Sequence, residues 1–275
     1  LLTFCVKLLS GTYPKFYVTL SADTRLEIPV GVHKYPFNFQ LPYNIPSSFE
    51  HRNGKIRYTV KAVIDRAWKF DHECMAAFTV IAPLDLNTQQ DKCVRNRYSK
   101  LNTFPKSFSS LNMQVSMPVS GYVPGQSIDT LMEYENHSDS VKLTKISILT
   151  FRSRTPSSHE KIVACEIAYT KNSGPLLAKG QVVTNIVIPS IPPSNLDYCS
   201  IIDVYYRLLV FIHVSGLYVR FNNSLRQIQS ITGTQNIIDL SESKYVFGAN
   251  DPFSPKYPVF DYPVPGKAKY LPCNL

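Results

Sequence analysis

Four consecutive side chains that can bind metals occur at Asp71, His72, Glu73 and Cys74. Carboxylate, imidazole and thiolate groups are the usual ligands of zinc, which holds four of them in a tetrahedron. The consecutive spacing departs from that of tetrahedral zinc sites. A loop of charged residues between two strands explains the cluster equally well, so the sequence predicts neither a metal nor another cofactor.

Paired carboxylates are the second arrangement that could do chemistry. Asp65 with Asp71, or Glu133 with Glu135, could supply a general acid and a base. Exposed carboxylates two residues apart on a strand also share one face for no catalytic reason, because strand side chains alternate. The sequence contains no glycine-rich nucleotide loop, no H-E-x-x-H and no G-x-S-x-G. We therefore predict no catalytic residues and a protein that is not an enzyme.

A basic cluster lies in the stretch NTQQDKCVRNRYSK, residues 87–100. Neighbouring cations reinforce one another, which favours contact with a membrane surface or a phosphorylated partner; a solvated linker is the alternative. The whole chain is also basic, with a net charge of +9. Nucleic acid is not a predicted partner, because this stretch has a single aromatic residue, Tyr98, on which a base could stack. The candidate contact residues are Lys92, Arg95, Arg97 and Lys100.

The elements that carry these residues read as β-strands. The chain has 17 Tyr and 15 Phe, which favour strands over helices. Apolar and polar residues alternate over residues 55–65, and an unbroken apolar face runs from Ile202 to Ile212 at every second position. A third, short strand is expected over residues 37–41, because Pro36 and Pro42 bracket it and proline suits strand ends.

The distribution of turns, prolines and charges predicts the domain organisation. Regularly spaced strands separated by turns such as VPGQ, residues 123–126, are typical of a β-sandwich. Six prolines after residue 250 predict an extended tail. We expect a partial sandwich over residues 1–86, a basic linker over 87–109, a second sandwich over 110–240 and a Pro-rich tail over 241–275.

Cysteine usage and hydropathy bear on the compartment. The six cysteines are scattered, without the spacing of a disulfide framework, which suits a reducing cytosol. The strongest apolar stretch, residues 201–212, is shorter than the roughly 20 residues that cross a bilayer. We expect a cytoplasmic protein without a transmembrane segment.

The first half of the chain resembles a known family. YPFNFQLP at residues 35–42, PSSFEHRNGKIRYTVKAVIDRAW at 46–68 and FTVIAPLDLN at 78–87 are similar to the second half of an arrestin N-terminal domain. The similarity is to the arrestin-domain-containing proteins, or α-arrestins, which share a PFSFQLP strand, a PSSFEG turn, a VRYWVKA strand and an aliphatic-Asp-Arg-Pro-Trp corner. This sequence departs from those motifs at Asn38, Thr59 and Ala67.

The second half continues the resemblance. GYVPGQSIDTLMEYENHSD, residues 121–139, is similar to the opening of the arrestin C-terminal domain, and IPPSNLDYCSIIDVYYRLLV, residues 191–210, resembles its later strand motif. The resemblance implies an all-β fold of two immunoglobulin-like β-sandwich domains. The resemblance begins near residue 27, and the roughly 26 residues before it are too few for the strands that complete the N domain at roughly 5–6 residues each. We therefore expect an incomplete first sandwich, as in an N-terminally truncated chain.

The resemblance also implies a function without catalysis. α-Arrestins are adaptors that couple membrane-protein cargo to HECT-type ubiquitin ligases and so direct endocytosis, sorting and protein transport at the plasma membrane and endosomes. They bind the ligase through a P-P-x-Y motif, and this sequence has none. Expected partners are therefore cargo tails, a HECT-type ligase reached without P-P-x-Y, and a membrane surface in peripheral contact.

An extracellular immunoglobulin-like adhesion module is the alternative function. Such a module would require disulfides, and the single tryptophan, Trp68, does not lie between cysteines at the immunoglobulin spacing.

Overall fold

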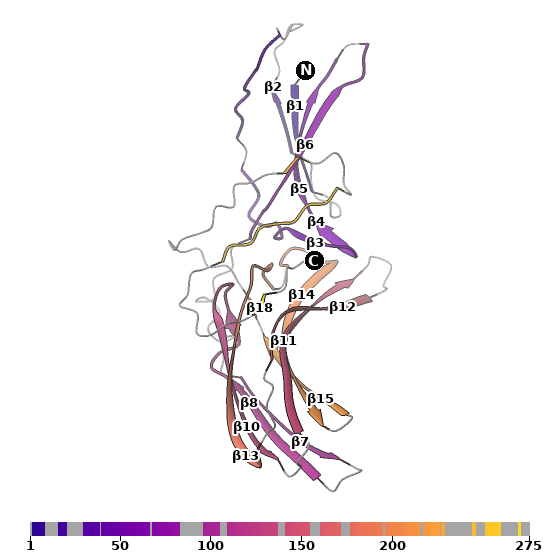
Figure 1. Ribbon diagram of the computed structural model, residues 1–275. Coiled ribbons are helices and arrows are strands. Elements are labelled where there is room, and N and C mark those ends of the chain that lie inside the picture. The colour runs from indigo at the N-terminus through magenta and orange to yellow at the C-terminus, as the bar shows by residue number, and fades with distance from the viewer. Residues whose placement is uncertain are drawn as a thin grey trace. The chain divides into compact units, whose positions relative to one another are not determined.

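A computed structural model describes the chain as strands and connecting segments (Figure 1). None of the described residues belongs to a helix long and apolar enough to cross a membrane. For several strands only the backbone is described. The described residues are 2–8, 16–20, 30–38, 40–66, 68–82, 96–104, 109–136, 141–154, 160–171, 177–194, 196–214, 217–225, 227–228, 244–245, 251–259 and 269–270.

The chain divides into two compact units. Unit 1 consists of Leu1–Ala82 with Asp239–Lys256 and Leu275, and unit 2 consists of Pro83–Ile238 with Tyr257–Asn274. The break at residues 82 and 83 lies four residues before the boundary expected from composition. Residues 239–256, most of which were expected in a separate tail, are part of unit 1.

Unit 1 is built on a five-stranded antiparallel sheet in the order β17-β6-β5-β1-β2. A separate antiparallel hairpin, β3–β4, accompanies it. The strands are β1 (Leu2–Leu8), β2 (Phe16–Leu20), β3 (Phe49–His51), β4 (Gly54–Ile56), β5 (Tyr58–Ile64), β6 (His72–Phe78) and β17 (Lys244–Tyr245).

The strand predicted over residues 55–65 is observed as β4 and β5, which are separated at Arg57. Its expected alternation is broken at the junction, where Ile56, Arg57, Tyr58 and Thr59 are all buried. Consecutive strand residues point to opposite faces, so side chains on both faces of the chain are covered there. A side-chain period of two reports burial only where one face of a strand is open to water.

The short strand expected over residues 37–41 is not formed, so that prediction is wrong. The described residues from 31 to 42 belong to no strand, and Tyr35 and Phe37 are each 38% exposed. Phe39 lies outside the described residues. Pro36 and Pro42 have no N–H to donate, and no described strand pairs with the segment. Alternation alone therefore did not make a strand here.

Unit 2 is a β-sandwich of two antiparallel sheets, which appear as facing layers in Figure 1. The four-stranded sheet has the order β13-β10-β8-β7 and the five-stranded sheet the order β15-β14-β11-β12-β18, while β9 and β16 form a short parallel pair. The strands are β7 (Asn96–Phe104), β8 (Ser109–Met117), β9 (Gly121–Tyr122), β10 (Ser127–Asn136), β11 (Val141–Arg154), β12 (Glu160–Thr170), β13 (Lys179–Val187), β14 (Ile202–Val214), β15 (Leu217–Leu225), β16 (Gln227–Ile228) and β18 (Lys269–Tyr270).

The core of unit 2 follows from strict alternation on its central strands. Along β10 every second residue is buried, and the residues between are half-buried or exposed. β14 confirms the long strand predicted over residues 202–212, because its apolar face from Ile202 to Val210 is buried and Asp203 and Arg207 are exposed. Each large apolar side chain buried in this way contributes roughly 1.5–3 kcal/mol to folding.

One of the predicted turns is observed, and it is hydrogen-bonded to another segment of unit 2. In VPGQ, Gly125 has φ +92°, and the Gln126 N–H donates to the Val123 carbonyl over 3.1 Å. Proline followed by glycine at the two central positions is typical of a type II turn, whose third residue needs positive φ. The turn is joined to Ile188, because the Gly125 N–H donates to the Ile188 carbonyl at 2.7 Å.

Candidate partner-binding site in unit 1

Two serines fix the chain that leads into β3. The Ser48 N–H donates to the Val80 carbonyl, and the Ser48 hydroxyl accepts from the Val80 N–H, both over 2.8 Å. The neighbouring Ser47 hydroxyl accepts from the Ala82 N–H at 2.9 Å. Both serines are buried. These hydrogen bonds join the segment after β6 to the segment before β3, as the backbone bonds of a strand pair would. Both serine hydroxyls are bonded to backbone N–H groups.

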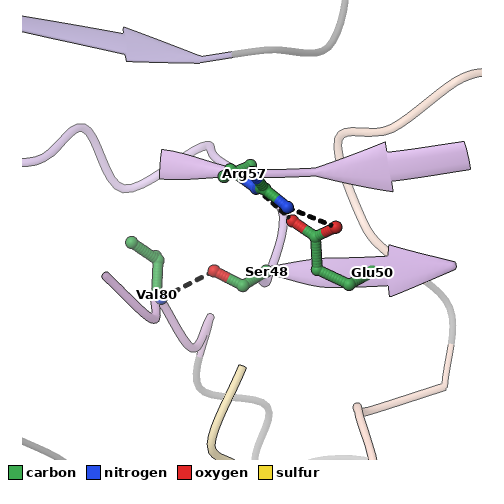
Figure 2. Close-up of polar contacts among 4 residues, drawn as sticks. All are labelled: Ser48, Glu50, Arg57 and Val80. Carbon is green, nitrogen blue, oxygen red and sulfur yellow. Dashed lines mark hydrogen bonds and ion pairs between the residues drawn. The ribbon is translucent and has the colours of Figure 1, made fainter. Parts of the chain in front are cut away.

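A buried ion pair lies beside the serines. Arg57 Nε is 2.5 Å from Glu50 Oε1, and Arg57 Nη2 donates to Glu50 Oε2 at 3.0 Å, as Figure 2 shows. The Arg57 and Glu50 side chains are only 3% and 11% exposed. The β3–β4 hairpin turns at Arg52 and Asn53 and so returns the chain toward Glu50. A two-pronged contact of this kind is the strongest form of arginine–carboxylate pair.

A segment from the far end of the chain covers the pair. The Arg57 guanidinium lies 5.5 Å from the centre of the Phe253 ring, a cation–π distance. Three residues later the Lys256 N–H donates to the Thr79 hydroxyl at 3.1 Å. Upstream, β17 pairs with β6 through Lys244 opposite Ala77 and Tyr245 opposite Ala76. Residues 244–256 therefore contact unit 1 at three places, although the sequence predicted only an extended tail.

The polar groups of this arrangement are paired with one another inside unit 1. In the described part of unit 1 the Glu50 carboxylate is neutralised by Arg57, and the two serine hydroxyls accept from backbone N–H groups. A nucleophilic serine instead needs a base that takes its proton. What the network provides is a rigid support, because breaking any member would leave a buried polar group unsatisfied.

The predicted cluster of metal-binding side chains is divided among separate partners. Asp71 Oδ1 accepts from the Arg66 N–H at 3.2 Å, His72 Nε2 contacts Arg66 Nη1, and Glu73 Oε1 accepts from Lys61 Nζ at 2.5 Å. Across the described ranges, no three side chains of this kind are grouped so that they could hold a metal ion. The expected loop holds only Asp71, because His72, Glu73 and Cys74 lie in strand β6.

The paired carboxylates Glu133 and Glu135 lie on the half-buried outer face of β10. Glu133 accepts from Gln114 at 2.7 Å and from Gln181 at 3.1 Å. Glu135 accepts from Lys179 at 2.7 Å, and this hydrogen bond raises the pKa of the Lys179 amine. The carboxylates thus belong to cross-strand pairs joining β8, β10 and β13, which stabilise a sheet face.

The basic cluster is only partly described. Lys92 and Arg95 lie outside the described residues. Arg97 and Lys100 lie in β7, where their backbones pair with Ser116 and Met113 of β8. Part of the segment expected as a linker is therefore a strand of unit 2, and contact by the four cations stays a prediction.

Sequence reasoning missed Glu50, Arg57 and Phe253 as a group. Opposite charges on either side of the turn at Arg52 and Asn53 were a usable signal, because a hairpin brings such residues together. Phe253 had no local signal, since nearly 200 residues separate it from Arg57.

Comparison with protein-family models matches both halves of the chain. Residues 9–87 match the arrestin (or S-antigen) N-terminal domain, and residues 107–231 match the arrestin (or S-antigen) C-terminal domain. With the strands described above, these matches support a fold of two β-sandwich domains.

Several characterised relatives are similar over most of the chain. Arrestin domain-containing protein 17 of Caenorhabditis elegans is 31% identical over 216 residues, which are 72% of this chain and 49% of that protein. Arrestin domain-containing protein 1 of Mus musculus and of Homo sapiens are each 30% identical over 200 residues, 71% of this chain and 46% of theirs. The chain thus spans about half the length of the relatives that it matches.

Proposed function

The chain belongs to the arrestin family as an α-arrestin, an arrestin-domain-containing protein, and on this premise we propose that it is a non-catalytic adaptor for membrane-protein cargo. Proteins of this family generally act as adaptors and not as enzymes. The observation that carries the proposal is the order of the two domain matches, N-terminal type before C-terminal type, on one all-strand chain.

The proposed partners are the cytoplasmic tails of receptors or transporters and a HECT-type ubiquitin ligase. Residues 1–275 contain no P-P-x-Y motif. The proposed place of action is the cytoplasmic side of the plasma membrane or of endosomes, during endocytosis and protein transport. Free thiols at Cys74, Cys165 and Cys199 agree with a reducing compartment.

The four cations of the basic cluster are part of the proposal. We propose that Lys92, Arg95, Arg97 and Lys100 contact an anionic partner, either phospholipid headgroups or a phosphorylated tail. Support comes from their spacing and from the net charge of +9.

Proximity labelling in cells tests the adaptor proposal. The full chain fused to a biotin-labelling enzyme is expected to enrich receptors, transporters and HECT-type ligases over the labelling enzyme alone. The matched control is the same fusion with Glu50→Gln, which removes one charge of the buried pair and is expected to lose enrichment as unit 1 is destabilised. Enrichment of extracellular adhesion proteins, with none of the sorting machinery, would contradict the proposal in favour of the adhesion alternative.

A further inference from the structure

The loop that joins β5 to β6 exposes two large aromatic side chains. Trp68 is 102% exposed and Phe70 is 96% exposed, relative to their fully accessible states. The loop runs from Asp65 to Asp71, and its residues 66 and 68–70 are termed the hairpin tip, which lies at the upper end of Figure 1. Tryptophan is highly buried on average in folded proteins. Two adjacent aromatics without cover are therefore informative.

Cations alternate with these aromatics in the hairpin tip. Arg66 and Lys69 lie beside Trp68 and Phe70, and the four side chains line an open hollow with Asp71 and His72. The Arg66 guanidinium contacts the His72 ring, which carries no negative charge to neutralise it. The nearest carboxylates in sequence, Asp65 and Asp71, flank the tip, and Asp71 accepts the Arg66 backbone N–H. The two cations are the charged residues beside the aromatics in sequence, and the loop 65–71 as a whole carries two cations and two carboxylates.

The backbone of the tip adopts an unfavourable conformation at Trp68, and burial of the side chain does not offset it. Trp68 has φ +63°, in the left-handed region, within a turn closed by the Lys69 N–H on the Arg66 carbonyl at 3.3 Å. A residue with a Cβ is disfavoured there, because Cβ approaches the following carbonyl oxygen. An exposed indole gains nothing from burial in compensation. Residues held in sparsely populated backbone regions of this kind cluster at functional sites.

We propose that the hairpin tip inserts into the interfacial layer of an anionic lipid bilayer. Trp68 and Phe70 would enter the boundary between headgroups and acyl chains, where aromatic rings concentrate in membrane proteins. Arg66 and Lys69 have stems long enough to keep their charges among the phosphates. The net charge of +9 draws the whole chain toward an anionic surface.

A lipid surface fits this site better than a protein partner does. The tip is the end of a two-stranded hairpin with two exposed apolar side chains, whereas a stable protein interface buries about 800 Å² on each side. Insertion of one or two aromatics with neighbouring cations is sufficient for peripheral attachment when the membrane is anionic. The inference deepens the proposed adaptor function, since cargo lies in a membrane.

The chain contains a built-in reporter for this proposal, because Trp68 is its single tryptophan. The full chain is titrated with vesicles of phosphatidylcholine alone and of phosphatidylcholine with phosphatidylserine. We expect Trp68 emission to move to shorter wavelength and to be quenched by acyl chains brominated near the headgroup, more strongly on the anionic vesicles. Free inorganic phosphate is expected to cause no shift, which separates a lipid surface from a phosphate site.

Variants assign the binding to the tip. The double substitution Trp68→Ala with Phe70→Ala is expected to weaken co-sedimentation with anionic vesicles by about tenfold or more, the scale of burying two aromatic side chains. Tyr43→Ala is the matched control, since Tyr43 is an 89% exposed aromatic of unit 1 away from the tip, and it should bind as the unchanged chain does.

Two results would overturn the inference. One is vesicle binding that leaves Trp68 emission unchanged and survives the double substitution, particularly if replacement of the four cations of the basic cluster by alanine abolishes it. The other is no binding to either vesicle. Neither result depends on cargo or ligase, so failure of the adaptor proposal in the labelling experiment remains distinguishable from failure here.

Discussion

At the residue scale, Glu50 and Arg57 show how a buried charge is made tolerable. The two groups are within hydrogen-bonding distance through two atom pairs, and the Phe253 ring lies against the guanidinium. Removing a charge from water costs several kcal/mol, which the partner offsets only when the geometry is good. The attraction between the two groups therefore adds little to the stability of unit 1, but loss of one partner alone is expected to destabilise it strongly.

Replacing Glu50 by Gln should lower the free energy of unfolding of unit 1 by about 3 kcal/mol, because Arg57 would keep a buried charge without its carboxylate. Urea unfolding of the full chain, followed by circular dichroism, measures the loss. The double variant Glu50→Leu with Arg57→Met is the control. It removes both charges and is expected to lie within about 1 kcal/mol of the unchanged chain. Equal losses in the single and double variants would refute this account.

At the scale of elements, the edge of the unit 1 sheet is covered by a short strand from far along the chain. β17 pairs with β6 over two residues, and the Lys256 N–H on Thr79 holds the same chain region a little further on. An open strand edge presents unpaired N–H and C=O groups to any other strand. β17 therefore protects β6 in addition to placing Phe253 near Arg57.

Introducing proline at both Lys244 and Tyr245 should open that edge, since proline has no N–H to donate to the ladder. Hydrogen exchange of the β6 amides is expected to become faster, most clearly at Ala76 and Ala77. The double alanine variant at the same positions keeps the backbone donors and should exchange at the original rate. Unchanged protection of β6 in the proline variant would show that β17 does not cover the edge.

At the scale of the whole molecule, the two units have separate cores and need not unfold together. Tyr122 gives unit 2 its own dependence on pH. Its side chain is buried, and this burial, to which the nearby Asp129 charge adds, raises the pKa of the phenol to about 12 from the ordinary 10.0. Above pH 10 the unfolded state loses this proton first, so unfolding becomes more favourable.

The stabilisation from neutral Tyr122 should be complete below pH 10 and lost as pH rises toward 12. Between about pH 9 and about pH 11.5 the unfolding free energy of unit 2 should fall by about 2 kcal/mol more in the unchanged chain than in Tyr122→Phe, which has no phenol to ionise. Denaturant unfolding across this range measures the difference. Parallel pH profiles for the two proteins would show that Tyr122 does not titrate as the burial implies.

The sequence by itself determined the class of fold, the family and the strongest elements. The apolar face of β14 and the turn at Gly125 are local patterns, and a period of two or a Pro-Gly pair constrains the backbone wherever it occurs. The resemblance to the α-arrestins rested on collinear motifs, and the matches to both arrestin domains confirm it. All of these signals come from residues that are close together in the sequence.

Only the tertiary structure decided which distant residues meet. It paired Glu50 with Arg57, brought Phe253 to the same guanidinium, added β17 to β6 and placed β7 in a sheet where composition indicated a linker. It also left residues 37, 38, 40 and 41 without a strand despite the alternation expected over 37–41, because a strand requires a partner for its backbone groups. The exposure of Trp68 likewise became known only from the tertiary structure. Local patterns fix the preferences of a segment, but burial and pairing depend on what the rest of the chain places against it.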